Sequence, residues 1–211
     1  MNSLRQLLTK TYRTMVFVIV GSFSMACLSQ AVPLRAERPD IKVGQSWKYQ
    51  TVDNRTKVLE SKAEFLVTSV TEQQIDGMAL DGKFTMSPSL ESIDSATGSQ
   101  KTKTSFLSFP LEVGKKWTHK VDWVNKATNS NGAQSFDIAV VGVEKVTTPA
   151  GELEAFRIES KGYSNNYASR GQGSDKRVAW YAPSAKAIVK IERNDGYSNF
   201  TRELMEFKLQ P

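Results

Sequence analysis

The chain has one histidine, His119, and one cysteine, Cys27, so few of its side chains could act as a nucleophile, a general base or a soft metal ligand. A Ser-His-Asp triad would have to use His119. The sequence contains no Gly-x-Ser-x-Gly turn of the kind that presents a hydrolase serine. One histidine and one cysteine also cannot supply the ligands of a usual zinc site.

The carboxylates offer the remaining chemistry. Glu152 and Glu154 would share one face of a strand, and glycoside cleavage needs two carboxylates that face each other. On an alternating strand, however, such a pair is typical of a solvated outer face. The Gly-Gln-Gly at 171–173 is followed by no Lys-Ser/Thr, and no loop has the acidic spacing of a calcium site. The sequence therefore predicts no catalytic residue, no metal site and no cofactor.

Aromatic residues are the strongest remaining candidates for a site. All four tryptophans fall in segments that we expect to be strands. They could line a pocket for an apolar ligand, or they could belong to the ordinary core, where aromatic side chains dominate packing. The candidates are Trp47, Trp117, Trp123 and Trp180.

Two of these tryptophans end a repeated phrase. The sequence IKVGQSW at 41–47 returns as LEVGKKW at 111–117. Glycine permits the backbone angles of a sharp turn, so each phrase predicts a turn followed by a strand. Side chains two apart share a face of a strand. His119 then takes the place that Tyr49 has in the first copy, which indicates packing or a hydrogen bond at a rim rather than catalysis.

The rest of the chain after residue 41 consists of predicted strands and turns. Hairpins are expected with turns at 76–77, 149–151 and 194–196, and polar loops at 87–103 and 161–177. Short strands are expected at 106–110 and 178–183, each stopping at a proline. The matched features predict two duplicated strand units, 41–110 and 111–183, within a single β domain at 41–211.

The predicted fold class is therefore mainly β, with roughly nine to eleven antiparallel strands and little helix beyond a signal peptide. A sheet of this kind must bury one face, and a curled, half-barrel-like sheet is the favoured arrangement. Its concave side would offer a surface on which a small apolar ligand could bind.

Residues 1–26 have the pattern of a secretory signal peptide: basic residues, then an apolar run that is too short for a membrane span. Cleavage is expected after Ala26 or after Ala31. Cleavage after Ala26 would follow a lipoprotein box and make Cys27 a lipidated first residue. Residues 27–40 would form a flexible tether. The predicted location is the periplasm or the outer membrane, with membrane contact only through the signal peptide or a lipid anchor.

The net charge of the chain is +6, but three of its positive charges lie in the first 26 residues, which have no acidic residue. The remainder carries only about +3, so its surface gives no electrostatic argument for binding nucleic acid.

Three phrases resemble a known family: FPLEVGKKW at 109–117, VTTPAGELEAFRI at 146–158 and WYAPSAKAIVKIE at 180–192. They are similar to the exported bacterial family called domain of unknown function 3108. The resemblance implies a curled sheet related to the lipoprotein-carrier group, and it implies no catalytic residues. Lys186 stands where that family often has glycine, which indicates a different turn there.

Together these observations predict an uncharacterised, exported bacterial envelope protein that is not an enzyme and binds an apolar or lipid-like ligand. The alternative is an accessory module, periplasmic or tethered to a surface, that binds an envelope protein through the loops at 87–103 and 161–177. A hydrolase that uses only carboxylates is the third hypothesis.

Overall fold

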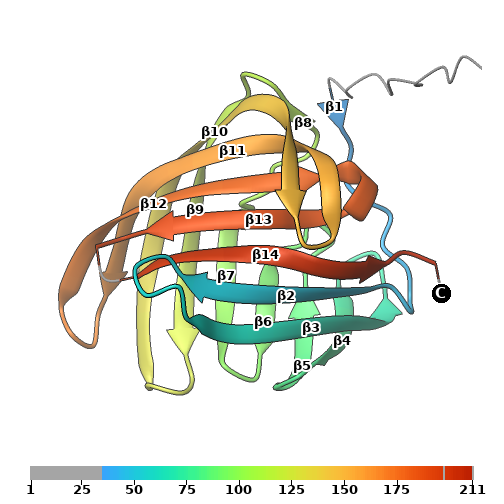
Figure 1. Cartoon of the computed structure of the whole chain (residues 1–211). Coiled ribbons are helices and arrows are strands. Elements are labelled where there is room, and N and C mark those ends of the chain that lie inside the picture. The colour runs from blue at the N-terminus through green and yellow to red at the C-terminus, as the bar shows by residue number, and fades with distance from the viewer. Residues whose placement is uncertain (1–34, 197, 211) are drawn as a thin grey trace, which may run out of the picture. The chain divides into compact units, whose positions relative to one another are not determined.

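The structure is a computed structural model that describes residues 35–196 and 198–210. Twelve strands form one closed antiparallel barrel (Figure 1). In barrel order they are β10 (Ser130–Thr148), β11 (Gly151–Asn166), β12 (Gly171–Ala182), β13 (Ala187–Asn194), β14 (Asn199–Lys208), β2 (Ser46–Asp53), β3 (Leu59–Val70), β4 (Ile75–Ala79), β5 (Gly82–Met86), β6 (Ser92–Ser95), β7 (Gly98–Thr104) and β9 (Lys116–Asn125).

Two short strands, β1 (Arg35–Ala36) and β8 (Leu111–Glu112), form a separate antiparallel pair. The only helix in the described part of the chain is one 3-10 turn, η1 (Pro183–Ala185). The prediction of a mainly β, antiparallel, curled sheet is confirmed. The curl goes further than a half-barrel, because β9 pairs with β10 and thereby closes the sheet.

The two Val-Gly turns have the same local structure. Gly44 and Gly114 have φ angles of 88° and 89°, which only glycine adopts without strain. The Gly44 amide donates to the Val67 carbonyl at 2.9 Å, and the Gly114 amide donates to the Val140 carbonyl at 2.8 Å. The repeated phrase therefore starts β2 and β9 in the same way. The origin of the two units by duplication stays a prediction.

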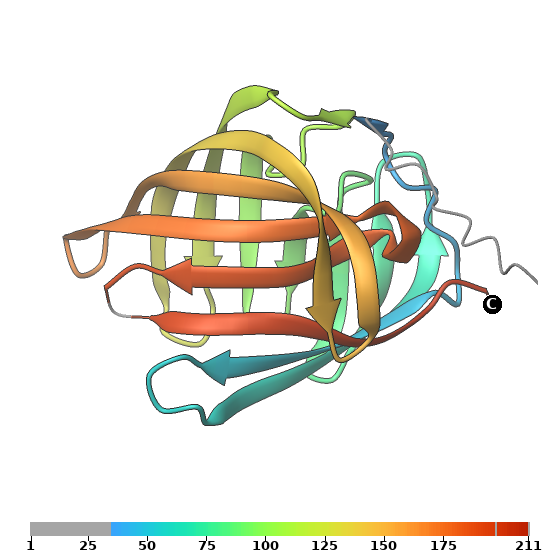
Figure 2. The same cartoon turned by 45° about the horizontal axis from the view of Figure 1, so that its top comes forward.

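The barrel has apolar side chains on both sides of its wall. Inside, alternate residues of β10, β11 and β12 form a lumen core that contains Phe136, Ile138, Phe156, Ile158, Ala179 and Tyr181. Outside, the tip of the β10–β11 hairpin bends back across β12, β13 and β14 (Figure 2). The Ala150 amide in this tip donates to the Leu204 carbonyl of β14 at 3.1 Å. The tip covers an outer core that contains Val146, Ala155, Trp180 and Ala182.

Four local predictions were wrong. Residues 92–95 and 98–104 are strands β6 and β7 rather than a polar loop, and residues 161–177 mostly continue β11 and β12. Residues 76–77 form no turn but lie inside β4, where they pair with β3 and β5. The glycine serves close packing rather than a turn, because a Cβ at Gly77 would lie 2.3 Å from Phe84 Cζ. Residues 106–110 form no strand.

The predicted signal peptide, its cleavage sites and Cys27 lie outside the described residues, as does most of the predicted tether. The last residues of that tether lie against the barrel. Ala36 is buried and pairs with Leu111, and Arg35 makes an ion pair with Glu112 at 2.6 Å.

Candidate functional site: the barrel lumen

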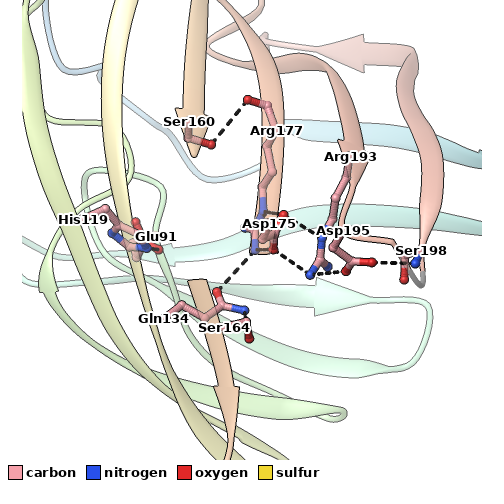
Figure 3. A network of polar contacts seen from close by, with 10 residues as sticks. All are labelled: Glu91, His119, Gln134, Ser160, Ser164, Asp175, Arg177, Arg193, Asp195 and Ser198. Carbon is pink, nitrogen blue, oxygen red and sulfur yellow. Dashed lines mark hydrogen bonds and ion pairs between the residues drawn. The ribbon is translucent and has the colours of Figure 1, made fainter. Parts of the chain in front are cut away.

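One end of the lumen holds a cluster of charges around Asp175, whose side chain is 1% exposed (Figure 3). Arg177, two residues along β12, donates to it from Nη2 at 2.6 Å and from Nε at 3.2 Å. Arg193 on the neighbouring strand β13 donates from Nη2 at 2.8 Å and from Nε at 3.2 Å. One buried carboxylate thus receives two guanidinium forks, the geometry in which arginine binds a carboxylate most strongly.

The cluster continues outward from these three residues. Arg193 also pairs with Asp195 at 2.9 Å, and the Gln134 amide oxygen on β10 accepts from Arg177 at 3.4 Å. The Arg177 guanidinium lies 4.4 Å from the centroid of the Phe136 ring, a cation–π contact that closes the cluster toward the lumen core.

Two opposed effects set the pKa of Asp175. Burial alone would raise it, but the hydrogen bonds and charges of Arg177 and Arg193 outweigh burial and hold the pKa of this carboxyl below its usual value. Asp175 is therefore charged at neutral pH, and each arginine beside it has a partner.

His119 lies across the lumen from this cluster and is 3% exposed. Its Nδ1 contacts the Thr104 carbonyl oxygen, which can only accept, so Nδ1 carries a proton. Its Nε2 lies 3.9 Å from the Glu91 carboxylate. The ring also packs edge-on against Phe106 and stacks on Phe136. This arrangement combines the packing and the hydrogen bond that the match with Tyr49 predicts.

Glu91 is buried as well, and its carboxylate accepts from the Phe106 amide at 2.7 Å. Burial raises the pKa of Glu91, while the Phe106 amide and the charges of His119 and Arg177 act in the opposite direction and only partly compensate. The surroundings of Glu91 therefore stabilise its charged form less than the surroundings of Asp175 stabilise that of Asp175.

The other end of the lumen is apolar. Trp47 and Tyr49 on β2 face Phe65 on β3, and the Tyr49 and Phe65 rings meet edge-on with centroids 6.0 Å apart. The Trp47 indole donates to the Ala185 carbonyl at 2.8 Å, and the Tyr49 hydroxyl donates to the Ile188 carbonyl at 3.1 Å. With both polar atoms bonded to the wall, the rings present only apolar surface. The cavity that they line has a volume of about 170 Å³.

A second cavity of about 300 Å³ lies between this apolar end and the charged cluster. Its walls include Glu91, His119, Arg177 and Arg193. The two cavities share four lining residues: Leu90, Ile188, Ile191 and Arg202. The two cavities therefore adjoin, and the second alone reaches the lower end of the size range of small-molecule sites, which span roughly 300–1,000 Å³.

The four predicted tryptophans do not gather along one stripe. Trp47 lines the apolar cavity. Trp117 donates to the Ser105 carbonyl at 3.1 Å and packs against the lumen core. Trp123 lies against Gly132, and its buried indole nitrogen has no hydrogen-bond partner within the described residues. Trp180 is in the outer core, donating to Glu144 at 2.7 Å.

The outer face of β9–β14 is hollowed into a groove of about 980 Å³. Its lining includes outward lysines and carboxylates in equal number: Lys116, Lys161 and Lys176 with Asp137, Glu159 and Glu192. Arg177 and Arg193 also border the groove, so cations outnumber carboxylates among its lining residues. Glu152 also lies on the solvated exterior, paired with Lys145 at 2.9 Å, as the alternation of β11 predicts.

Within residues 35–196 and 198–210, no group of three or more histidine, cysteine, aspartate or glutamate side chains could hold a metal ion. In the same part of the chain, no helix is long and apolar enough to cross a bilayer.

Solved structures share this fold at low sequence identity. A predicted lipoprotein from Parabacteroides distasonis matches with a TM-score of 0.54 and 14% identity, covering 82% of this chain and 99% of its own. A predicted exported protein with a YmcC-like fold from Bacteroides fragilis matches with a TM-score of 0.53, 14% identity and the same coverage. The hypothetical lipoprotein YmcC from Escherichia coli matches with a TM-score of 0.50 and 10% identity, covering 80% of this chain and 85% of its own.

These likenesses establish a shared fold. No protein family model matches the chain, and no curated protein matches it in sequence. The resemblance to domain of unknown function 3108 therefore stays a prediction.

The charged residues of the lumen were missed by the sequence analysis. A signal was present, because Asp175 and Arg177 are two apart and must share a face of a strand, as must Ile191 and Arg193. Their polar character led us to expect a loop in this segment. Arg202 gave no signal of its own, since its neighbourhood depends on the closing of the barrel.

Proposed function

We propose that this chain is an exported envelope protein without enzymatic activity, and that its barrel lumen holds a small, largely apolar ligand. The observation that carries the proposal is the cavity lined by the rings of Trp47, Tyr49 and Phe65, in which the indole N–H of Trp47 and the hydroxyl of Tyr49 are bonded to backbone carbonyls of the wall. Empty apolar cavities reduce stability, at roughly 24 cal/mol per Å³ in a well-studied case. A cavity kept at this position is better explained by an occupant than by packing.

Two further observations support the proposal. The structures that share this fold are named as lipoproteins or exported proteins, which agrees with the signal peptide expected at residues 1–26. The buried carboxylates are also engaged by neighbouring groups: Asp175 is held by two arginines, and Glu91 accepts from the Phe106 amide and faces His119.

Binding of a neutral apolar dye such as N-phenyl-1-naphthylamine to the mature protein tests the proposal. Met86 lines the apolar cavity, whereas Met78 on the adjacent strand is 44% exposed on the outer face. Met86→Trp should fill the cavity and abolish dye fluorescence, while Met78→Trp, the matched control, should leave it unchanged. Equal binding by both variants, or no binding by the unmodified protein, would contradict a ligand in the lumen.

The second candidate is an accessory module that binds an envelope protein. The groove on the outer face of β9–β14 favours it, because its size and its many charged side chains suit a polar, net acidic protein surface. Reversing the charges of Lys161 and Lys176 should then abolish a crosslinked adduct formed in cells. Retention of the adduct would exclude this groove as its docking site.

A further inference from the structure

Arg202 differs from the other two arginines of the lumen in having no carboxylate partner. Arg177 and Arg193 are both paired with Asp175. In the described residues, the one hydrogen bond of the Arg202 side chain runs from Nε to the Thr51 hydroxyl oxygen at 3.3 Å. That bond fixes the orientation of the guanidinium plane, and the two terminal nitrogens remain available.

The nearby carboxylates are engaged elsewhere. Asp195 pairs with Arg193, and Glu91 accepts from the Phe106 amide and faces His119. Glu203, next to Arg202 in the chain, lies within 3.8 Å of Lys190, on the opposite face of the strand. Burial lowers the pKa of Arg202, the direction expected for a cation that gives up water without gaining an anion. Arginine nevertheless keeps its proton in proteins, so an uncompensated charge remains.

The position of this charge is specific. Arg202 lines both cavities, together with the apolar side chains of Leu90, Ile188 and Ile191. On one side of it lies the aromatic cavity of Trp47 and Phe65. A molecule that placed an anionic group on Arg202 would direct an attached apolar chain into that cavity.

From this juxtaposition we propose that the lumen binds an anionic amphiphile, with a carboxylate or phosphate oxyanion on the terminal nitrogens of Arg202 and an apolar chain packed against Trp47 and Phe65. This inference rests on the proposed function and adds the chemical class of the ligand. The planar fork of arginine matches either oxyanion in a bidentate arrangement. The small volume of the aromatic cavity, about 170 Å³, suits a chain of medium length.

Displacement of bound N-phenyl-1-naphthylamine from the mature protein provides the test. Decanoate, decyl phosphate, decan-1-ol and decylammonium share one apolar chain and differ in the head group. The unmodified protein should bind the anions more tightly than the alcohol, and the cation most weakly. The better of the two anions identifies the head group. Equal affinity for decanoate, decan-1-ol and decylammonium would overturn the inference.

Arg202→Met keeps much of the length of the side chain and removes its charge. Because a hydrogen bond to a charged group contributes about 1.5–3 kcal/mol, the variant should lose roughly ten- to hundredfold in anion affinity. Its affinity for decan-1-ol and for the dye should stay within about twofold. Arg38→Met, at an exposed position outside the barrel, is the matched control and should change nothing.

The outcomes separate the two proposals. If Met86→Trp abolishes dye binding but the four ligands displace the dye equally well, the proposal of an apolar ligand is supported and the proposal of an anionic head group is rejected. Absence of dye binding would remove both. If Arg202→Met fails to fold, the ranking of the four ligands on the unmodified protein still decides the question.

Discussion

The two ends of the lumen differ in how their buried polar groups are satisfied. At the apolar end, the polar atoms of Trp47 and Tyr49 bond to backbone carbonyls of the wall, and the rings leave an open cavity. At the charged end, Asp175 binds two arginines and the side chains satisfy one another. The first end is left open to a ligand, whereas the second is internally complete, and Arg202 lies where they meet.

The largest predicted effect is at the charged end. Asp175→Asn would leave Arg177 and Arg193 without their shared carboxylate, and breaking a buried pair in this way costs about 3–5 kcal/mol. The free energy of unfolding in urea measures the loss. Asp94→Asn is the control, because Asp94 pairs with Lys126 on the exposed surface, where such pairs contribute at most about 1 kcal/mol.

The same variant carries a prediction on pH. The pKa of Asp175 is lower in the folded protein than its unfolded value of about 3.9. Its stabilising contribution is therefore present above about pH 4 and is lost as the pH falls through the folded value. Asp175→Asn should flatten this part of the acid titration. If the free energy of unfolding of Asp175→Asn falls as steeply below pH 4 as that of the unmodified protein, groups other than Asp175 cause the acid destabilisation.

The next prediction compares a tryptophan on the inner side of the barrel wall with one on its outer side. Trp47→Phe and Trp180→Phe each remove an indole hydrogen bond, to the Ala185 carbonyl and to Glu144 respectively. Trp47→Phe should cost about 1–3 kcal/mol in unfolding free energy, because the Ala185 carbonyl is buried and would be left unsatisfied. Trp180→Phe should cost less, about 0.5–1.5 kcal/mol, because Glu144 is exposed and water can replace the indole N–H. Only Trp47→Phe should also change dye affinity. A change in dye affinity in Trp180→Phe would place the ligand outside the lumen.

At the junction of the two ends, Thr51→Val should cost about 1 kcal/mol, since it removes the acceptor of the Arg202 Nε–H while keeping the shape of the side chain. The free guanidinium would lose its fixed orientation, and anion affinity should fall with it. Thr68→Val on the exposed face of β3 is the control and should stay within about 0.5 kcal/mol. Unchanged anion affinity in Thr51→Val would mean that the threonine does not position Arg202.

The smallest predicted effect is a gain. The pKa of Glu91 is raised by burial above its unfolded value, so its contribution to stability is present below that value and is lost as the pH rises through the folded one. Glu91→Gln keeps an oxygen for the Phe106 amide and removes the charge. The variant should melt slightly higher than the unmodified protein at neutral pH and no higher at pH 3. A lower melting temperature at neutral pH would show that the pairing with His119 outweighs burial.

The difference between the apolar end and the charged end of the lumen also explains which strands could be predicted from the sequence. The alternation in β2 and β9, such as Trp47, Tyr49 and Thr51 on one face, was enough to predict strands and the residues that share a face. At the charged end, the inward positions of β11 and β12 are Ser160, Gly162 and Asp175. Those strands carry polar side chains on both faces, so the segment had the composition of a loop. Their pairing is long-range, and no local pattern shows it.

The candidate site was predictable only in part, for a related reason. Trp47 was singled out by its repeated phrase, and it does line a lumen cavity. Trp180 was singled out equally, yet it lies in the outer core, because the β10–β11 hairpin covers the outside of the wall. Which face of a strand is the lumen depends on how the sheet closes, and that is a property of the whole barrel.

Native mass spectrometry of the mature protein, purified without denaturant or detergent, shows whether the lumen holds a ligand. We expect a bound species of low mass that is released on unfolding, is absent from Met86→Trp and is retained in Met78→Trp. The unliganded mass alone, in all three proteins, together with no uptake of added decanoate, would contradict it.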